Sequence, residues 1–197
     1  MPKVSEEYRA ERRAHILAAA RRCFVQDGFH GTSMQDLVDE AGVSSGAFYR
    51  YFPSKDAVIE AIAAENLEQV VGVIRQSIEE GLTAEAAVGA VLEFVTARHA
   101  EDGFAAIALL VWSEALRNPT LAELLRTANA AAGQLLSPRP ASRRRRGPAV
   151  NDLLMCVLPG YLMQLALGGR AAVDRVPRAT KEIFGDAPAD VGASSRL

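Results

Sequence analysis

The sequence predicts an all-α protein with a small N-terminal unit of three helices followed by a larger helical body. Ala, Leu, Glu and Arg are abundant among the 197 residues, and apolar residues recur at spacings of three and four, as on one face of a helix. No Asn-Gly or Asp-Gly pair joins two alternating segments, so the signals of β-hairpins are nearly absent. We expect domains at 1–55 and 56–185, and a flexible tail over 186–197.

Composition places the chain among globular proteins, with 49% hydrophobic and 23% charged residues. It contains no apolar run of membrane-spanning length, and the N-terminus is polar, so we expect a soluble, cytoplasmic protein. Cys23 and Cys156 lie far apart without clustered His residues; we expect no metal and no cofactor, and interpret both as small apolar side chains. Residues 1–55 carry 8 basic against 7 acidic residues, a slightly more basic balance than the remainder.

The N-terminal helices are predicted from apolar spacing and from their end signals. The first runs from Tyr8 to Asp27 and stops at Gly28. Short helices are expected over Ser33–Glu40, where Ser33 and Asp36 form a start like a capping box, and over Ser44–Tyr51. After the break at Pro53-Ser54, a long helix is expected over Lys55–Glu80.

The body is predicted to consist of further helices separated by Gly and Pro breaks. Their expected ranges are Thr83–Ala100, Phe104–Leu116, Asn118–Leu136, Val150–Leu167 and Asp174–Phe184. The run Arg143–Arg146 falls between three prolines, so we expect an exposed loop there. Such a charge run is usually only solvated, although a contact with nucleic acid is a second interpretation.

The stretch from Thr32 to Phe52 has the pattern of a helix-turn-helix, in which two helices cross over a very short turn. Gly42 can adopt the positive φ that this turn needs, and the small Ala41 permits close approach. The side chains expected to pack inward are Leu37, Val38, Val43, Phe48 and Phe52. Those left to face outward are Ser45, Gly46, Tyr49 and Arg50. Tyr49 and Tyr51 could instead belong to the core; we favour exposure because Phe48 and Phe52 already fill the inner stripe.

At these positions the chain resembles the TetR family of transcriptional regulators. The matching positions over residues 8–60 are Ile16-Leu17, Ala20, Phe24, Gly28, Thr32-Ser33, Ala41-Gly42-Val43-Ser44, Gly46, Phe48-Tyr49-Arg50-Tyr51-Phe52 and Ser54-Lys55. The resemblance implies base contacts from Gln35, Ser45, Gly46 and Tyr49. It implies phosphate contacts from Thr32, Ser33, Ala47, Arg50, Tyr51 and Lys55. The chain departs from many family members at Ser45, where they carry a longer lysine, so base readout there should be short-range.

The resemblance further implies a homodimer that binds double-stranded operator DNA and a small-molecule effector. Pairing would use Val150–Leu167 and Asp174–Phe184. The side chains expected to line an effector pocket are Phe94, His99, Phe104, Trp112, Met155, Tyr161 and Gln164, although apolar residues at helical spacing are equally what an ordinary core requires. Binding of a mostly apolar effector would move the Lys55–Glu80 helix as a lever and release the DNA.

Two other classes of function are weighed against this interpretation. An enzyme finds little support, because the sequence contains no catalytic triad order, metal-ligand spacing or Gly-rich phosphate loop. A helical adaptor whose helix-turn-helix contacts protein would lack salt-dependent binding to duplex DNA.

Overall fold

The computed structural model describes residues 6–137 and 147–176, and within these ranges every regular element is a helix. The predicted all-α class is confirmed. The helices are α1 (Glu6–Gly31), α2 (Met34–Ala41), α3 (Ser45–Tyr51), α4 (Lys55–Glu79), α5 (Ala84–Asp102), α6 (Phe104–Ala115), α7 (Pro119–Leu136) and α8 (Gly147–Val173). The loop with Arg143–Arg146, most of the helix expected over Asp174–Phe184 and the tail over 186–197 lie outside the described residues.

Glycines with positive φ set several of the helix ends. Gly28, at φ 70°, interrupts α1 where the sequence predicts its end, and a short turn continues to Gly31. Gly103, at φ 72°, ends α5 one half-turn later than the expected Ala100. Gly169, at φ 63°, kinks α8 just beyond the predicted stop at Leu167. Glycine reaches this region of φ without the steric cost that a Cβ atom brings.

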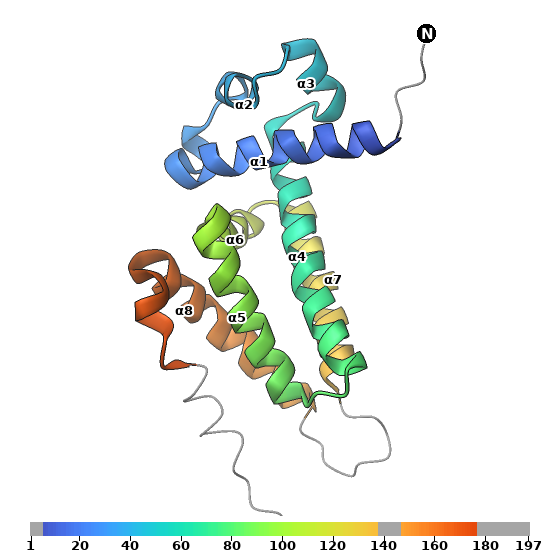
Figure 1. The fold of residues 1–197 in the computed structure, drawn as a ribbon, viewed down its shortest axis with the longest axis vertical. Helices are drawn as coiled ribbons and strands as arrows, with labels where there is room; N and C mark the ends of the chain where they lie inside the picture. Colours follow the sequence, from blue (N-terminus) through green and yellow to red (C-terminus); the bar gives the residue numbers. More distant parts are fainter. Residues whose placement is uncertain (1–5, 138–146, 177–197) are drawn as a thin grey trace, which may run out of the picture.

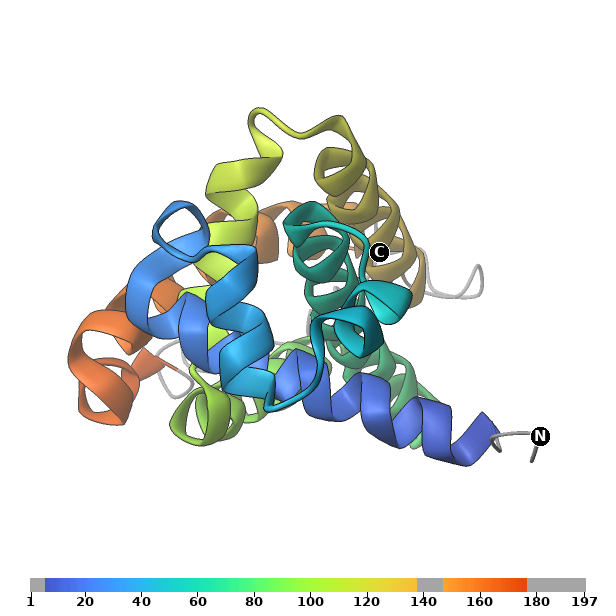
Figure 2. The ribbon, with the colours of Figure 1, turned by 90° about the horizontal axis from the view of Figure 1, so that it is seen from above.

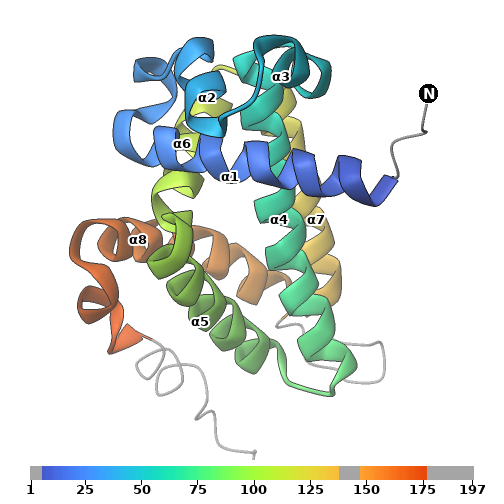
Figure 3. The ribbon, with the colours of Figure 1, turned by 45° about the horizontal axis from the view of Figure 1, so that its top comes forward.

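The first three helices form a cap at one end of the molecule, and α4 leads from this cap along the body (Figure 1). Helix α1 crosses the beginning of α4, while α2 and α3 lie on the far side of α1 from the body (Figures 1 and 3). Seen from above, α1 to α3 lie in front of part of the body, and α7 and α8 extend beyond them (Figure 2). Helix α4 leads from the cap and packs along α5 and α7 of the body. A movement of this helix would therefore affect both the cap and the body.

Two hydrophobic clusters form the core. The first joins α1, α2, α3 and the beginning of α4, and it continues into the body through Ile107 and Val111 of α6 and Leu121 of α7. The second lies among α5, α6, α7 and α8 around Leu92 and Leu162. The helix-turn-helix unit therefore shares its apolar core with the body. Among the described helices, none combines the length and the apolar character that a membrane crossing requires.

Candidate nucleic-acid interface and effector cavity

Helix α2 begins at a complete capping box. The Ser33 hydroxyl accepts a hydrogen bond from the Asp36 backbone N–H, and the Asp36 carboxylate accepts from the Ser33 backbone N–H at 2.7 Å. The Asp36 carboxylate accepts from the Ser33 backbone N–H and also from the Ser33 hydroxyl, and these two bonds, the backbone one first, lower the pKa of Asp36. The sequence-based prediction of this start is confirmed, and the orientation of α2 is fixed by local chemistry.

The turn between α2 and α3 is equally defined by short-range contacts. Gly42 adopts φ 60° and donates its N–H to the Asp39 carbonyl, and Ser44 caps α3 by accepting from the Ala47 N–H. The His15 ring nitrogen Nε2 lies 2.9 Å from the Ala41 carbonyl, which ties the end of α2 to α1. Phe48 is fully buried against α1, so the opposite side of α3 must face outward.

That outward side of α3 carries the residues that the sequence places there. Ser45, Gly46, Tyr49 and Arg50 are exposed, and the Tyr49 side chain stands edge-on to Phe48. Tyr51 is half-buried against the first cluster, with the Arg50 guanidinium 5.9 Å from its ring centre, so its predicted exposure is only partial. Phe52 is 3% exposed and belongs to the core, as expected.

Gln35 and Ala47 complete the predicted contact surface. Gln35 is exposed on α2, where its amide donates to the Asp39 carboxylate at 2.7 Å. This pairing uses one N–H of the amide, so the second N–H and the amide oxygen remain for a contact with a base. Ala47 is half-buried at the start of α3. Its backbone N–H donates to the Ser44 hydroxyl and forms part of the N-terminal capping of that helix.

Like Ser33 and Ala47, whose donors bind Asp36 and Ser44, the predicted phosphate contacts Thr32 and Lys55 have other partners in the structure. The Thr32 side chain is 1% exposed and donates to the Gly28 carbonyl at 2.8 Å, so its hydroxyl is not presented to solvent. The Lys55 ammonium donates to the carbonyls of Phe29 and Thr32 at 2.6 and 2.8 Å. Both carbonyls lie at the connection between the end of α1 and α2, and Lys55 supplies each with a donor. Its first role is to hold the α1–α2 connection, with one ammonium N–H left for a phosphate.

The body contains an apolar cavity of about 230 Å³ bounded by α4, α5, α6, α7 and α8. Phe104, Trp112 and Met155 line it, together with Leu67 and Val71 of α4 and other side chains. These three aromatic and thioether groups are among the residues that the sequence predicts for an effector pocket. Because α4 forms one wall, a bound molecule would contact the helix that carries the helix-turn-helix.

The other four predicted pocket residues do not line this cavity. Phe94 packs edge-on against Phe104 with ring centres 5.9 Å apart. The Tyr161 hydroxyl lies 2.7 Å from the Thr96 hydroxyl and joins α8 to α5. Gln164 is exposed on α8, and His99, although half-buried, does not border the cavity. Helical spacing identifies apolar faces but does not tell which of them meet across a void.

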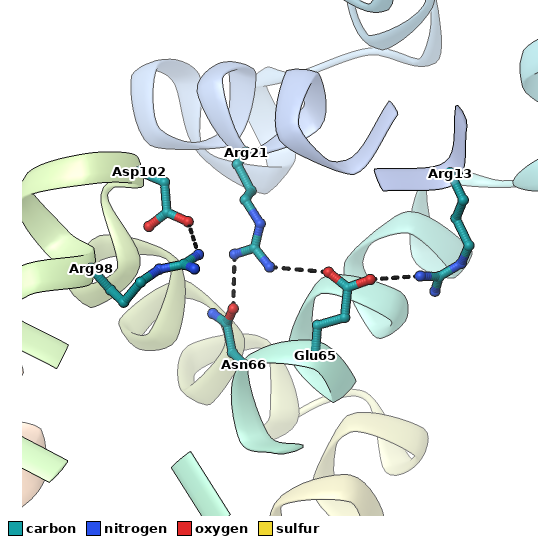
Figure 4. A network of polar contacts seen from close by, with 6 residues as sticks. All are labelled: Arg13, Arg21, Glu65, Asn66, Arg98 and Asp102. Atoms are coloured by element: carbon teal, nitrogen blue, oxygen red, sulfur yellow. Dashed lines mark hydrogen bonds and ion pairs between the residues drawn. The ribbon is translucent and has the colours of Figure 1, made fainter. Parts of the chain in front are cut away.

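A polar network joins α1 to α4 and was not predicted from the sequence. The Arg21 guanidinium, 6% exposed, donates from Nη1 to Asn66 Oδ1 at 2.8 Å and lies 3.4 Å from the Glu65 carboxylate (Figure 4). Glu65 also pairs with Arg13. Burial lowers the pKa of Arg21, an effect opposed by the charges of Asp102 and Glu65. The available signal was Arg21 itself, a charged residue on the apolar stripe between Leu17 and Phe24.

Two further contacts join the helix-turn-helix unit to the body. His30, at the end of α1, lies 3.1 Å from the Glu114 carboxylate of α6. At the α5–α6 junction, a Cβ atom added to Gly103 would come within 2.5 Å of the Val25 side chain, so only glycine permits this approach. The cap and the body therefore meet through apolar, polar and close backbone contacts.

The described His, Cys, Asp and Glu side chains are the candidate ligands for a metal ion, and Cys23 is one of them. Within 6–137 and 147–176, no group of three or more His, Cys, Asp or Glu side chains could hold a metal ion. Burial raises the pKa of the Cys23 thiol, and the nearby carboxylates of Glu40 and Asp36 raise it further. Cys23 is thereby kept as a protonated thiol packed on the first cluster.

The helix-turn-helix with its exposed second helix, carried on a helical body, defines a DNA-binding transcriptional regulator. The chain belongs to the tetR family of bacterial regulatory proteins, whose model matches residues 16–62. The HTH-type transcriptional repressor Rv1474c of Mycobacterium tuberculosis is 33% identical over 177 residues, which cover 85% of this chain and 89% of that protein. The HTH-type transcriptional regulator UidR of Escherichia coli is 27% identical over 172 residues, covering 87% of this chain and 86% of UidR.

Solved structures share the whole architecture. Salmonella enterica GusR has a TM-score of 0.66 and 26% identity, covering 94% of this chain and 100% of GusR. A transcriptional regulator of Saccharomonospora viridis, solved in complex with choline, has a TM-score of 0.70 and 19% identity, covering 90% of this chain and 97% of that one. The likeness to the second structure concerns the fold alone.

Proposed function

We propose that this regulator is a repressor that binds a palindromic operator as a homodimer and is released by a small, largely apolar effector. The observation that carries the proposal is the position of α4, which begins beside the exposed recognition helix and forms a wall of the apolar cavity. The Mycobacterium tuberculosis relative is named as a repressor, which supports this direction of regulation.

The DNA contacts would come from both ends of the helix-turn-helix. Tyr49, Ser45 and Gly46 would face base edges in the major groove, together with the oxygen and second N–H of the Gln35 amide. Phosphates would meet Ser33, Ala47, Arg50 and Tyr51, and the N–H of Lys55 that its two carbonyl contacts leave over. Few of these groups are cationic, so one copy would bind weakly and two copies would be required.

The second copy would pair along α8, through the predicted segments Val150–Leu167 and Asp174–Phe184. Exposed apolar side chains on the described part of α8 support this interface: Val157 is 39%, Met163 46% and Leu167 78% exposed. Gly160 and Cys156 are exposed beside them and leave room for a second helix to approach. Two-fold pairing of one surface patch with itself is the commonest route to a homodimer.

Binding to the duplex upstream of the protein's own gene, measured at two salt concentrations, tests the DNA-binding part. Arg50→Ala should weaken binding to all sequences and flatten the salt dependence by about one unit, because one phosphate contact is lost. Tyr49→Ala should change site preference. Arg75→Ala, an exposed arginine on α4, is the matched control and should leave binding intact. Affinity that ignores salt would favour an adaptor that contacts protein.

Light scattering tests the dimer. Met163→Glu places a charge on the exposed apolar face of α8 and should produce monomers that no longer hold the operator. Leu82→Glu changes a residue of similar exposure, 44%, in the α4–α5 connection and should leave the dimer intact. A wild-type protein that is monomeric at micromolar concentration contradicts the proposed pairing.

A further inference from the structure

Asn66 lies on α4 where the apolar cavity and the polar contact with α1 meet. Its side chain lines the cavity, and it is 5% exposed. Its Oδ1 atom accepts the 2.8 Å hydrogen bond from Arg21 of α1 (Figure 4). Among the described residues that line the cavity, Asn66 is the polar side chain that is more than nine-tenths buried; Asn129 is exposed.

The chemistry of Arg21 fixes the orientation of this amide. A guanidinium group only donates hydrogen bonds, so the Asn66 oxygen must face Arg21 and the Nδ2 group must face elsewhere. Nδ2 is buried and has no hydrogen-bond partner among the described residues. A buried donor without a partner is unfavourable, and a molecule that brings an acceptor into the cavity would remove this cost.

The lining also limits the charge of such a molecule. Among the side chains that the structure describes, no cation borders the cavity to neutralise an anion and no carboxylate borders it to hold a cation. A ligand that only donates hydrogen bonds would have to share the Asn66 oxygen with Arg21 and would leave Nδ2 without an acceptor. The cavity therefore favours an apolar body with one neutral acceptor, such as a ketone, ester or ether oxygen.

Arg21 has an alternative partner close by. The Asp102 carboxylate interacts electrostatically with Arg21, and Arg98 binds only one of its oxygens. The second oxygen, Oδ1, is buried and has no hydrogen-bond partner in the described part of the chain. If the Asn66 amide is drawn toward the cavity, the Arg21 guanidinium can move toward this oxygen and carry α1 with it.

We propose that Asn66 anchors an effector that carries a neutral hydrogen-bond acceptor on an apolar body, and couples the occupied cavity to the DNA-binding unit through Arg21. This inference rests on the proposed function, since it names the chemical class of the effector and the route of its action. The anchor for the effector is Nδ2 of the Asn66 amide, and the route to the DNA-binding unit is the hydrogen bond from Arg21 to Oδ1 of the same amide. They can therefore be tested separately.

Calorimetric titration with three probes of nearly equal size tests the anchor. Acetophenone offers an acceptor, ethylbenzene has no polar group, and 1-phenylethylamine is a cation that only donates. Acetophenone should bind roughly fivefold more tightly than ethylbenzene, the effect of one neutral hydrogen bond, and the amine should bind weakest. Equal affinities for the first two, or no binding of any probe, would overturn the anchor.

Two variants separate the anchor from the route. Asn66→Asp keeps an oxygen for Arg21 but lacks the N–H group, so it should bind acetophenone no more tightly than ethylbenzene. Arg21→Met keeps the amide, so the preference for acetophenone should persist while acetophenone no longer weakens binding to the duplex. Arg21→Lys provides the same comparison if the methionine variant does not fold. An Asn66→Asp protein that retains the preference overturns the anchor, and an Arg21 variant still released by acetophenone overturns the route.

The calorimetric result does not depend on DNA. A wild-type protein that binds no duplex but prefers acetophenone contradicts the proposed function and leaves the anchor supported. A wild-type protein that binds its duplex but does not distinguish the probes overturns the anchor and leaves the repressor proposal in place.

Discussion

The helix-turn-helix unit and the helical body differ in how their positions are determined. In α2 and α3, neighbours in sequence fix the geometry: Ser33 with Asp36 begins one helix, Gly42 turns the chain and Ser44 begins the other. In the body, the cavity depends on side chains from five helices that meet at a distance along the chain. Local hydrogen bonding can be recognised from spacing, whereas a cavity depends on how separate helices face one another.

The junction between the two regions depends on both local features and contacts between residues far apart in the sequence. Val25 packs beside Gly103, and Arg21 reaches Asn66, through contacts between residues far apart in sequence. Yet each contact depends on a local feature, a glycine with positive φ or a charge on an apolar stripe. Substitutions at these places test how independently the two regions fold.

The largest expected effect distinguishes the inner from the outer side of α3. Phe48→Ala should lower the free energy of unfolding by about 3–5 kcal/mol, because a fully buried aromatic ring is replaced by a cavity. Tyr49→Ala, at the next residue, should change it by less than about 0.5 kcal/mol, as at other exposed positions. Urea denaturation measures both. Equal losses would mean that Tyr49 also supports the fold.

A smaller loss is expected at the junction with the body. Gly103→Ala should cost about 2 kcal/mol, since it forces a Cβ atom into a positive-φ position and against Val25. The double variant Gly103→Ala with Val25→Ala should recover part of this loss by relieving the contact while keeping the backbone strain. Thermal unfolding measures the comparison. Complete recovery would show that the backbone conformation carries no cost.

Substitution of Lys55 tests whether this predicted phosphate contact mainly stabilises the fold. Lys55→Met should lower the free energy of unfolding by about 1–2 kcal/mol, because two carbonyls lose a charged donor. Arg50→Met removes an exposed charge and should instead change only the salt dependence of DNA binding. Denaturation and binding at two salt concentrations separate the roles. If Lys55→Met leaves the free energy of unfolding unchanged, the structural role is contradicted, and the prediction that Lys55 acts mainly as a phosphate contact stands.

The smallest effect concerns the acid dependence of the capping box. The pKa of Asp36 is lowered in the folded state, so its ionised form stabilises the protein above the pKa of the unfolded chain, about 4. This stabilisation is lost as the pH falls through the lower folded-state pKa. Asp36→Asn should therefore be less stable than wild type near neutral pH, with the difference shrinking in acid. A difference that is constant from pH 7 to pH 2 contradicts this role.

Particular residues show how far the candidate site could be predicted. The outward positions of Ser45, Gly46 and Tyr49 follow from the buried positions of Phe48 and Phe52 on the same short helix. The burial of Thr32 could not be predicted, because it depends on the turn after Gly28, where the Thr32 hydroxyl donates to the Gly28 carbonyl. The cavity was only partly predicted, since the faces carrying Tyr161 and Phe94 turn toward other helices.

The sequence alone determined the helical class, the positions of the caps and breaks, and the side of α3 that faces outward. These features depend on residues within one or two turns of each other, whose hydrogen bonds and spacing act wherever the rest of the chain lies. Only the tertiary structure decided that Lys55 binds the carbonyls beyond α1, that Arg21 reaches Asn66, and which side chains enclose the cavity. Such contacts depend on how whole helices pack, because spacing along a helix gives its faces but not its neighbours.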